Sequence, residues 1–449
     1  MNGYKKTRTG LHLNIKSKRR NFLIISSLIF LIKILVIARI STVEVSGFTG
    51  KFWLGADGEN YLNGVKALTD GGLFSKDGIL NYWPAGYPLF IWIFGFFGKN
   101  FILTFLVVFQ SLIYSIAVFS FANQIIHTRL VKITNLLTVT LLLSPTLSMS
   151  SLVIGYESLA ASGYLLIASL FIWDFRVRTK KSLLISVGFS ALTISFQSFI
   201  QPRLILAGML ILIYWIFVRQ KNILKIFFII TIAFFLVTTL PASLIIRNHF
   251  ATGVNSISTN LGNTMKIGAG ETSGGYVKNP PGVPCDNSDP NPSKADNKLV
   301  RCVLDWYTKN PVKALKLFYN KSIFFWSPWF GPLANGTMAR NPWLTIHPLK
   351  NTIKTQEGFN LVYGFTGTFI SWLWLIGGLM MAIFGYLHLR KYDGVERHLG
   401  NLALFAIMCS WLVTLISIGD HRFRLPILTM SIFLQVVGLS TRKKSKQIK

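Results

Sequence analysis

The chain has 449 residues, of which 51% are hydrophobic and 14% are charged. Lysines and arginines number 46 against 16 aspartates and glutamates, a formal net charge of +30, and the mean hydropathy is +0.48. This composition excludes an ordinary soluble domain and predicts an all-α polytopic membrane protein. Nucleic-acid binding is not expected, because much of the positive charge lies in short clusters between apolar stretches, as in cytoplasmic loops.

The first 20 residues are basic and precede an apolar stretch at 21–40. This stretch is longer than a signal-peptide core of about 7 to 15 residues, and no small-residue cleavage site follows it, so we expect a retained first span. Lys33 lies midway along the span and Arg39 near its outer end. A charge inside a membrane span is a functional hypothesis by default, although Lys33 could also face a polar seam between helices.

A polar loop at 41–100 follows, and it contains the best candidate for chemistry, Asp57. A carboxylate just outside the bilayer, in a chain so poor in acidic residues, suggests a catalytic base beside an anion site. The structural alternative for Asp57 is to cap a short interfacial helix, whereas the neighbouring Glu59 is expected to be solvated. The aromatic segment 82–88 leads into apolar residues 89–97, which are too few to cross and predict a helix in the membrane interface.

Nine further apolar stretches bring the predicted number of transmembrane helices to about ten. They lie at 101–126, 132–149, 153–173, 182–199, 203–218, 224–246, 359–386, 400–418 and 425–439. The loops that this order places inside are basic, so the positive-inside rule predicts a multi-pass protein of the cell membrane with both termini in the cytoplasm. The Asp57 loop, the segment 247–357 and the link 419–426 then share the outer side.

The predicted organisation is a basic tail, a membrane core, a long outer segment, C-terminal membrane helices and a second basic tail, at 1–20, 21–246, 247–357, 358–440 and 441–449. The outer segment is rich in Gly, Asn, Ser and Pro, so we expect mostly loop with one or two helices near 299–322. Cys285 and Cys302 share this segment, and the sequence leaves open whether they form a disulfide, while Cys409 is expected inside a span.

The sequence contains no nucleotide-binding loop, dinucleotide motif, zinc-protease motif or serine-nucleophile elbow. The acidic residues of the outer segment show no calcium-loop spacing, so no cofactor is predicted, and a divalent metal is left open without support. An enzyme acting outside the membrane, where nucleotide sugars are absent, needs an activated donor carried by a lipid. The phosphate of such a lipid requires fixed cations near the interface.

Four short motifs occur in order on the predicted outer side. They are Ala56-Asp57 with Tyr61, then Pro84-Ala85-Gly86-Tyr87-Pro88-Leu89, then Arg247-Asn248 ahead of 257–263, and His421-Arg422-Phe423-Arg424-Leu425-Pro426. This pattern, over about residues 20–440, resembles the GT-C superfamily of membrane glycosyltransferases. It is most similar to bacterial relatives of dolichyl-phosphate-mannose protein mannosyltransferases and of the lipid A aminoarabinose transferase. The resemblance implies transfer of a sugar from a polyprenyl phosphate to an acceptor at the outer face of the cytoplasmic membrane.

The resemblance also implies roles for individual residues. Asp57 corresponds to the base that deprotonates the acceptor. The candidates for binding the substrate and its phosphate are Arg247, Arg422, Arg424, Lys266, His421 and Tyr61. Structural alternatives stand beside them, because Arg422 and Arg424 could anchor at lipid headgroups and Arg247 could pair with helix-end carbonyls.

Two further positions bear on the resemblance. Glu157, which follows Tyr156, resembles an acidic residue of the family and is assigned to the acceptor side. The Arg-Pro pair that such relatives carry at a span boundary is reversed here, as Pro202-Arg203, so Arg203 is not counted among the predicted site residues.

Two other functions compete with the transferase. A transporter or flippase of lipid-linked sugars predicts charges deep inside several spans and internal repeats, and no repeat is obvious. A polymerase or ligase of surface polysaccharide would take a polyprenyl diphosphate oligosaccharide and would depend on a loop arginine or histidine more than on Asp57. In the transferase reading, the partners are a polyprenyl-phosphate sugar, the lipid bilayer, and a glycan, lipid or protein acceptor.

Overall fold

The computed structural model describes residues 3–55, 57–98, 101–270, 282–286, 288–326 and 364–445. Seven helices among these residues are long and apolar enough to cross a membrane. They are Ile15–Arg39, Ile102–Ile125, Glu157–Val177, Lys180–Ile200, Pro202–Arg219, Ile223–Thr252 and Val395–Ile416. The prediction of an all-α polytopic membrane protein is therefore confirmed, while the number of ten spans and the GT-C fold remain predictions.

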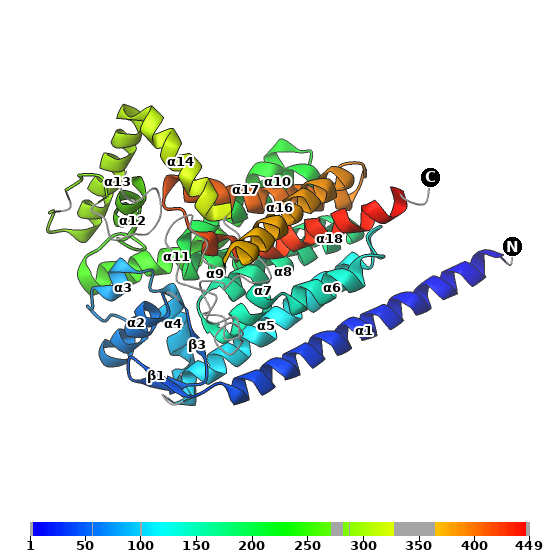
Figure 1. The fold of residues 1–449 in the computed structure, drawn as a ribbon, viewed down its shortest axis with the longest axis horizontal. Helices are drawn as coiled ribbons and strands as arrows, with labels where there is room; N and C mark the ends of the chain where they lie inside the picture. Colours follow the sequence, from blue (N-terminus) through cyan, green and yellow to red (C-terminus); the bar gives the residue numbers. More distant parts are fainter. Residues whose placement is uncertain are drawn as a thin grey trace.

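The helices form one bundle (Figure 1). Its long members are α1 (Gly3–Arg39), α5 (Ile102–Ile125), α8 (Glu157–Val177), α9 (Lys180–Ile200), α10 (Ile205–Arg219), α11 (Ile223–Thr252), α16 (Gly364–Leu389), α17 (Val395–Ile416) and α18 (Leu428–Ser445). The largest apolar core lies among α5, α8, α9, α10, α11, α16, α17 and α18. Only 22% of the apolar membrane-spanning part of α1 is buried. Helix α1 therefore runs along the side of the bundle against α5, with most of its surface facing outward (Figure 1).

The stretch predicted as a span at 132–149 is not one continuous helix. It forms α6 (Thr134–Leu143), α7 (Pro145–Met149) and the 3-10 turn η2 (Ser150–Leu152). The break falls at Ser144, with ψ at 112°, because Pro145 disfavours a helical residue before it. The 10 residues of α6 extend about 15 Å, half of a hydrocarbon core.

The loop at 41–100, which is predicted to face outward, folds into a small cap of short elements. Strand β1 (Val43–Val45) pairs antiparallel with β2 (Phe48–Gly50), and β3 (Trp53–Leu54) pairs parallel with β4 (Val153–Ile154). The helices are α2 (Gly58–Gly71), α3 (Ile79–Tyr82) and α4 (Gly86–Ile93), followed by the 3-10 turn η1 (Phe94–Phe97). The short helix predicted at 89–97 thus exists as α4 and η1, starting three residues earlier.

The segment 247–357, which is predicted to face outward, contains α12 (Leu261–Ala269), α13 (Pro292–Lys309) and α14 (Pro311–Trp326). The last two confirm the helices predicted near 299–322. Helix α13 begins earlier because Asn291 caps it, accepting from the amides of Ser293 and Lys294. Cys285 and Cys302 form a disulfide, with their Cα atoms 6.1 Å apart, and Cys409 is buried in α17 as expected.

The two chain ends and the cap lie at opposite ends of the bundle. The start of α1 and the end of α18 lie at one end, and β1, α2, α12 and α13 lie at the other (Figure 1). An even number of membrane crossings predicts that both chain ends lie on the same side. The assignment of the first end to the cytoplasm stays a prediction from the basic loops.

Candidate functional site

Two acidic residues far apart in the chain are brought to one edge of a strand pair. Strands β3 and β4 run parallel, and their last residues, Leu54 and Ile154, lie opposite each other. Asp57 and Glu157 each follow the last paired residue of their strand by three positions. Because parallel strands end at the same edge, both acidic residues lie where the chain turns into α2 and α8.

Asp57 immediately precedes the first turn of α2 and is partly exposed. Among the described N–H groups at the start of α2, none donates to the Asp57 side chain, so the carboxylate does not cap this helix. Gly58 fits closely behind it, since a Cβ atom there would lie 2.8 Å from Leu54 Cδ1 and 3.2 Å from the Ile154 oxygen. The start of α2 therefore packs directly on both strands.

Glu157 lies in the first turn of α8 and is 2% exposed. Tyr87 of α4 lies nearby, and its hydroxyl donates to Gln110 Oε1 at 3.0 Å and accepts from the Gly155 amide at 2.9 Å. Burial raises the pKa of Tyr87 well above its ordinary value, and the negative charge of Glu157 also acts to raise it. The phenol stays protonated and holds the turn at 153–157 in place.

Arg203, on the 3-10 turn η3 (Pro202–Leu204), joins this turn to a third segment. Its guanidinium donates to the Tyr156 hydroxyl, and its Cζ lies 3.4 Å from the ring centroid of Phe423. Phe423 belongs to the 3-10 turn η6 (His421–Arg424). Sequence reasoning discounted Arg203 because of the reversed order with Pro202. Its stacking on Phe423, a residue far along the chain, leaves no signal in the local sequence.

Arg424 follows Phe423 and is 5% exposed. Its Cζ lies 5.7 Å from the ring of Trp326, at the end of α14. Burial lowers the pKa of Arg424 to about 9, which leaves the guanidinium charged near neutral pH. A cation held away from water attracts an anion more strongly than a solvated one. The side chains of His421 and Arg422 lie outside the described part of the structure, so their predicted roles remain predictions.

Arg247, predicted as a phosphate ligand, lies near the end of α11 and is 3% exposed. It donates to the main-chain oxygens of Leu73, at 3.0 Å, and of Ser75. It also donates to the side-chain oxygens of Asn81 at 3.4 Å and Asn248 at 2.9 Å. These bonds tie α11 to the loop after α2. A phosphate at Arg247 would have to compete with all four of them.

The two remaining candidates lie in different surroundings. Tyr61 of α2 is buried, and its ring meets that of Tyr87 edge-on at 5.0 Å between centroids, which places it next to the turn of Glu157. Lys266 of α12 donates to the main-chain oxygen of Cys285 at 2.8 Å. Tyr61 therefore lies beside the turn that follows β4, whereas Lys266 supports the disulfide-linked segment.

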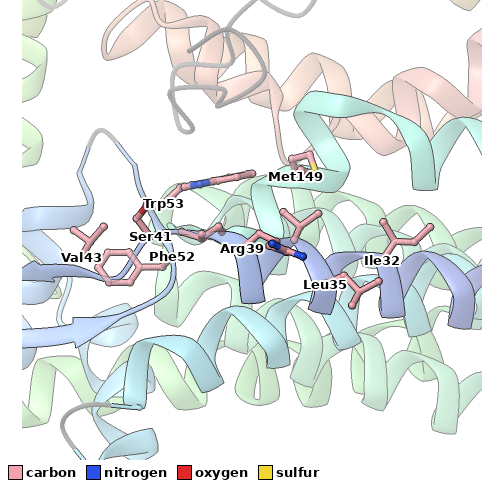
Figure 2. A pocket seen from close by; sticks show the side chains of 10 residues that line it. Ile32, Leu35, Arg39, Ser41, Val43, Phe52, Trp53 and Met149 are labelled. Carbon is pink, nitrogen blue, oxygen red and sulfur yellow. The ribbon is translucent and has the colours of Figure 1, made fainter. Parts of the chain in front are cut away.

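An apolar pocket of about 560 Å³ lies beside the start of β3. It lies between the C-terminal part of α1 and the segments that carry Trp53 and Met149 (Figure 2). Arg39 is the charged residue among the side chains that surround it (Figure 2). Trp53 is the first residue of β3, so the pocket lies beside the strand that leads to Asp57.

Within the described residues, no group of three or more His, Cys, Asp or Glu side chains could hold a metal ion. In comparisons with known proteins, no family model and no curated protein matches the chain. The resemblance to the GT-C superfamily therefore stays a prediction. The function has to be inferred from the residues that meet at the ends of β3 and β4.

Proposed function

We propose that the protein is a glycosyltransferase that moves a sugar from a polyprenyl phosphate to an acceptor at the membrane surface. The observation that supports this most directly is the contact of Arg203 with both Tyr156 and Phe423. Glu157 follows Tyr156, and Arg424 follows Phe423. We infer that the guanidinium groups of Arg203 and Arg424 and the carboxylates of Asp57 and Glu157 contribute to one site, with the charges that reaction of a glycosyl phosphate requires.

In the proposed reaction, the Asp57 carboxylate accepts a proton from an acceptor hydroxyl or amine while the acceptor atom attacks the anomeric carbon. The bond from this carbon to the phosphate oxygen breaks, and its electron pair leaves with the polyprenyl phosphate. Arg203 and Arg424 stabilise the negative charge of the departing phosphate, because a guanidinium fork matches phosphate oxygens. Attack opposite the leaving phosphate inverts the anomeric centre.

The other residues take supporting roles in this proposal. Glu157 is buried beside Tyr156 and Tyr87, and we assign it to the acceptor side. Arg247 supports the loop after α2, so the phosphate is assigned to Arg203 and Arg424 in its place. Arg422 and His421 remain candidates because they belong to the same turn as Arg424.

A lipid-borne donor also fits the pocket beside β3. Leu35 lines the pocket and is 67% exposed, so this side of α1 faces the surroundings of the bundle, which are lipid in a membrane protein. Arg39 supplies a cation at the same pocket (Figure 2). An amphiphile with a long apolar chain and an anionic head matches this combination of walls and charge.

The test compares deletion cells with cells that carry wild type, Asp57→Asn or Glu59→Gln at equal membrane levels. Mass spectrometry measures the polyprenyl-phosphate sugars and the surface glycans. Asp57→Asn is expected to slow transfer by about 10²-fold or more, so that one polyprenyl monophosphate sugar accumulates and one glycan modification is lost, as in the deletion. Glu59→Gln changes an exposed carboxylate two residues away and should behave as wild type.

The other outcomes identify the competing functions. Wild-type behaviour of Asp57→Asn would refute its role as the base. A polyprenyl diphosphate oligosaccharide that accumulates in the deletion would indicate a polymerase or ligase. A lipid-linked sugar that accumulates only in the inner leaflet would indicate a flippase.

A further inference from the structure

A lysine buried in the first span, Lys33, is connected to the turn that carries Glu157. Helix α1 has few buried positions, and Phe22, Lys33 and Ile37 are among them, each 3% exposed or less. Apolar side chains suffice to pack such a face. A buried ammonium group is costly within a membrane span, so a specific contact is needed to account for it.

Lys33 Nζ donates to Ser151 Oγ at 3.0 Å and lies 4.7 Å from the ring centroid of Tyr114. Ser151 belongs to η2, immediately before β4. Its hydroxyl also lies 3.0 Å from that of Ser111 on α5. The ammonium group is therefore placed where α1, α5 and the segment leading into β4 meet.

Gln110 of α5 extends the connection along this segment. Its Nε2 donates to the main-chain oxygens of Ser151 at 3.3 Å and Val153 at 3.0 Å. Its Oε1 accepts from the hydroxyl of Tyr87 at 3.0 Å. All four residues are buried, so these bonds are formed away from water, where they hold the backbone most firmly.

Tyr87 completes the series, because its hydroxyl accepts from the Gly155 amide at 2.9 Å. Hydrogen bonds thus lead from Lys33, through Ser151 and Gln110, to a residue two positions before Glu157. The segment between η2 and α8 is held by these contacts at Val153 and Gly155.

We propose that Lys33 is a positioning residue. It fixes the segment 150–155 against α1 and α5, so that β4 keeps its register with β3 and Glu157 stays beside the Asp57 loop. This inference rests on the proposed transferase function, because the contact of Lys33 with Ser151 is proposed to keep Asp57 and Glu157 in position for transfer. A small displacement of such groups is enough to slow a reaction between aligned atoms.

A purely structural role makes a different prediction. Ser151 Oγ also donates to the Ser148 oxygen at 2.9 Å, so removal of Lys33 leaves the serine hydroxyl with a partner. Replacing a buried charge by an apolar side chain of similar size is often neutral or stabilising. Lys33→Met should therefore keep the melting temperature while it loosens segment 150–155. A structural role predicts a lower melting temperature instead.

Hydrogen exchange measured by mass spectrometry on the purified full-length protein tests the positioning directly. In Lys33→Met, amide exchange in 150–157 is expected to rise about tenfold. Lys18→Met is the matched control, because Lys18 also lies on α1 and donates to a main-chain oxygen, that of Val131, at 3.1 Å. The control should leave exchange in 150–157 unchanged.

The rate is measured by adding each protein to detergent-solubilised membranes of deletion cells and following the loss of the accumulated polyprenyl-phosphate sugar. Lys33→Met should lower kcat about tenfold and leave KM unchanged. Unchanged exchange, or an unchanged kcat, would overturn the positioning role. If the wild-type protein does not consume the sugar, the proposed function fails; if it does and Lys33→Met is as fast, the positioning role alone fails.

A double-mutant cycle provides a second measurement. Tyr87→Phe removes the acceptor of the Gly155 amide at the other end of the same series. If both residues act through one segment, the double variant should be little slower than the slower single variant. Rate losses that simply multiply would overturn the proposal, because they would show two independent effects.

Discussion

Arg247 on α11 donates through Nε to the main-chain oxygen of Leu73 at 3.0 Å and so joins a long apolar helix to the loop after α2. Arg247→Met removes this bond and the three others, which leaves buried acceptors without their donor. The free energy of unfolding should fall by about 1 to 3 kcal/mol, because buried acceptors are left unsatisfied, and this is read as a lower melting temperature in detergent. Arg301→Met, on an exposed position of α13, is the control. A raised donor KM with unchanged melting would instead identify Arg247 as a phosphate ligand.

Arg203→Lys keeps the positive charge and removes the planar fork that contacts Tyr156 and Phe423. Donor KM is expected to rise about tenfold, because a lysine neither stacks nor binds phosphate oxygens in pairs. The control is Arg129→Lys, since the Cζ of Arg129 lies 5.6 Å from the Tyr392 ring centroid in another part of the protein. Equal donor KM values for wild type and Arg203→Lys would exclude Arg203 from the phosphate site.

Donor binding at the proposed phosphate site should weaken at alkaline pH. Burial lowers the pKa of Arg424 to about 9. Only the charged guanidinium attracts the donor, and a phosphodiester keeps its charge over this range. Donor binding should be constant below about pH 9 and then weaken towards about tenfold per pH unit as the arginine loses its proton. The measurement is donor KM between about pH 7 and pH 10.

Arg424→Gln provides the comparison for this pH dependence. It should bind the donor more weakly than wild type near neutral pH and show no further decline above about pH 9. If the decline persists in Arg424→Gln, another group causes it.

The disulfide between Cys285 and Cys302 should stabilise the segment around α12 and α13. The two cysteines are separated by 17 positions, and Lys266 donates to the Cys285 oxygen at 2.8 Å. Replacing both cysteines by serine should cost this segment about 3 kcal/mol and speed limited proteolysis between 261 and 309. A reductant should reproduce the effect on wild type and add nothing to the double variant. Equal cleavage rates would contradict the prediction.

The long helices could be predicted because their signal is local. The span predicted at 182–199 appears as α9, and Thr179 and Ser182 cap its start reciprocally. The span predicted at 132–149 was divided by Pro145, which a hydropathy average over a window does not register. Composition and hydropathy therefore predict the fold class, whereas the positions at which helices break depend on single residues.

The contacts of the candidate site depend on residues that are distant in sequence. Asp57 stood out because acidic residues are rare in this chain. Arg247 donates to main-chain oxygens, which every residue type carries, so no sequence motif could reveal these acceptors. The same holds for Lys33, whose partner Ser151 lies 118 positions away. These pairings follow from the packing of helices and become visible only in three dimensions.

The short pairing of β3 with β4 also sets the N-terminal ends of two helices at one edge, because α2 begins at Gly58 and α8 at Glu157. Each helix end presents main-chain N–H groups and about half a positive charge. Two such ends attract anions whatever side chains surround them. In the proposed transferase, side chains at the rim can therefore change, and with them the sugar or the acceptor, while the backbone dipoles continue to favour negative charge at the same place.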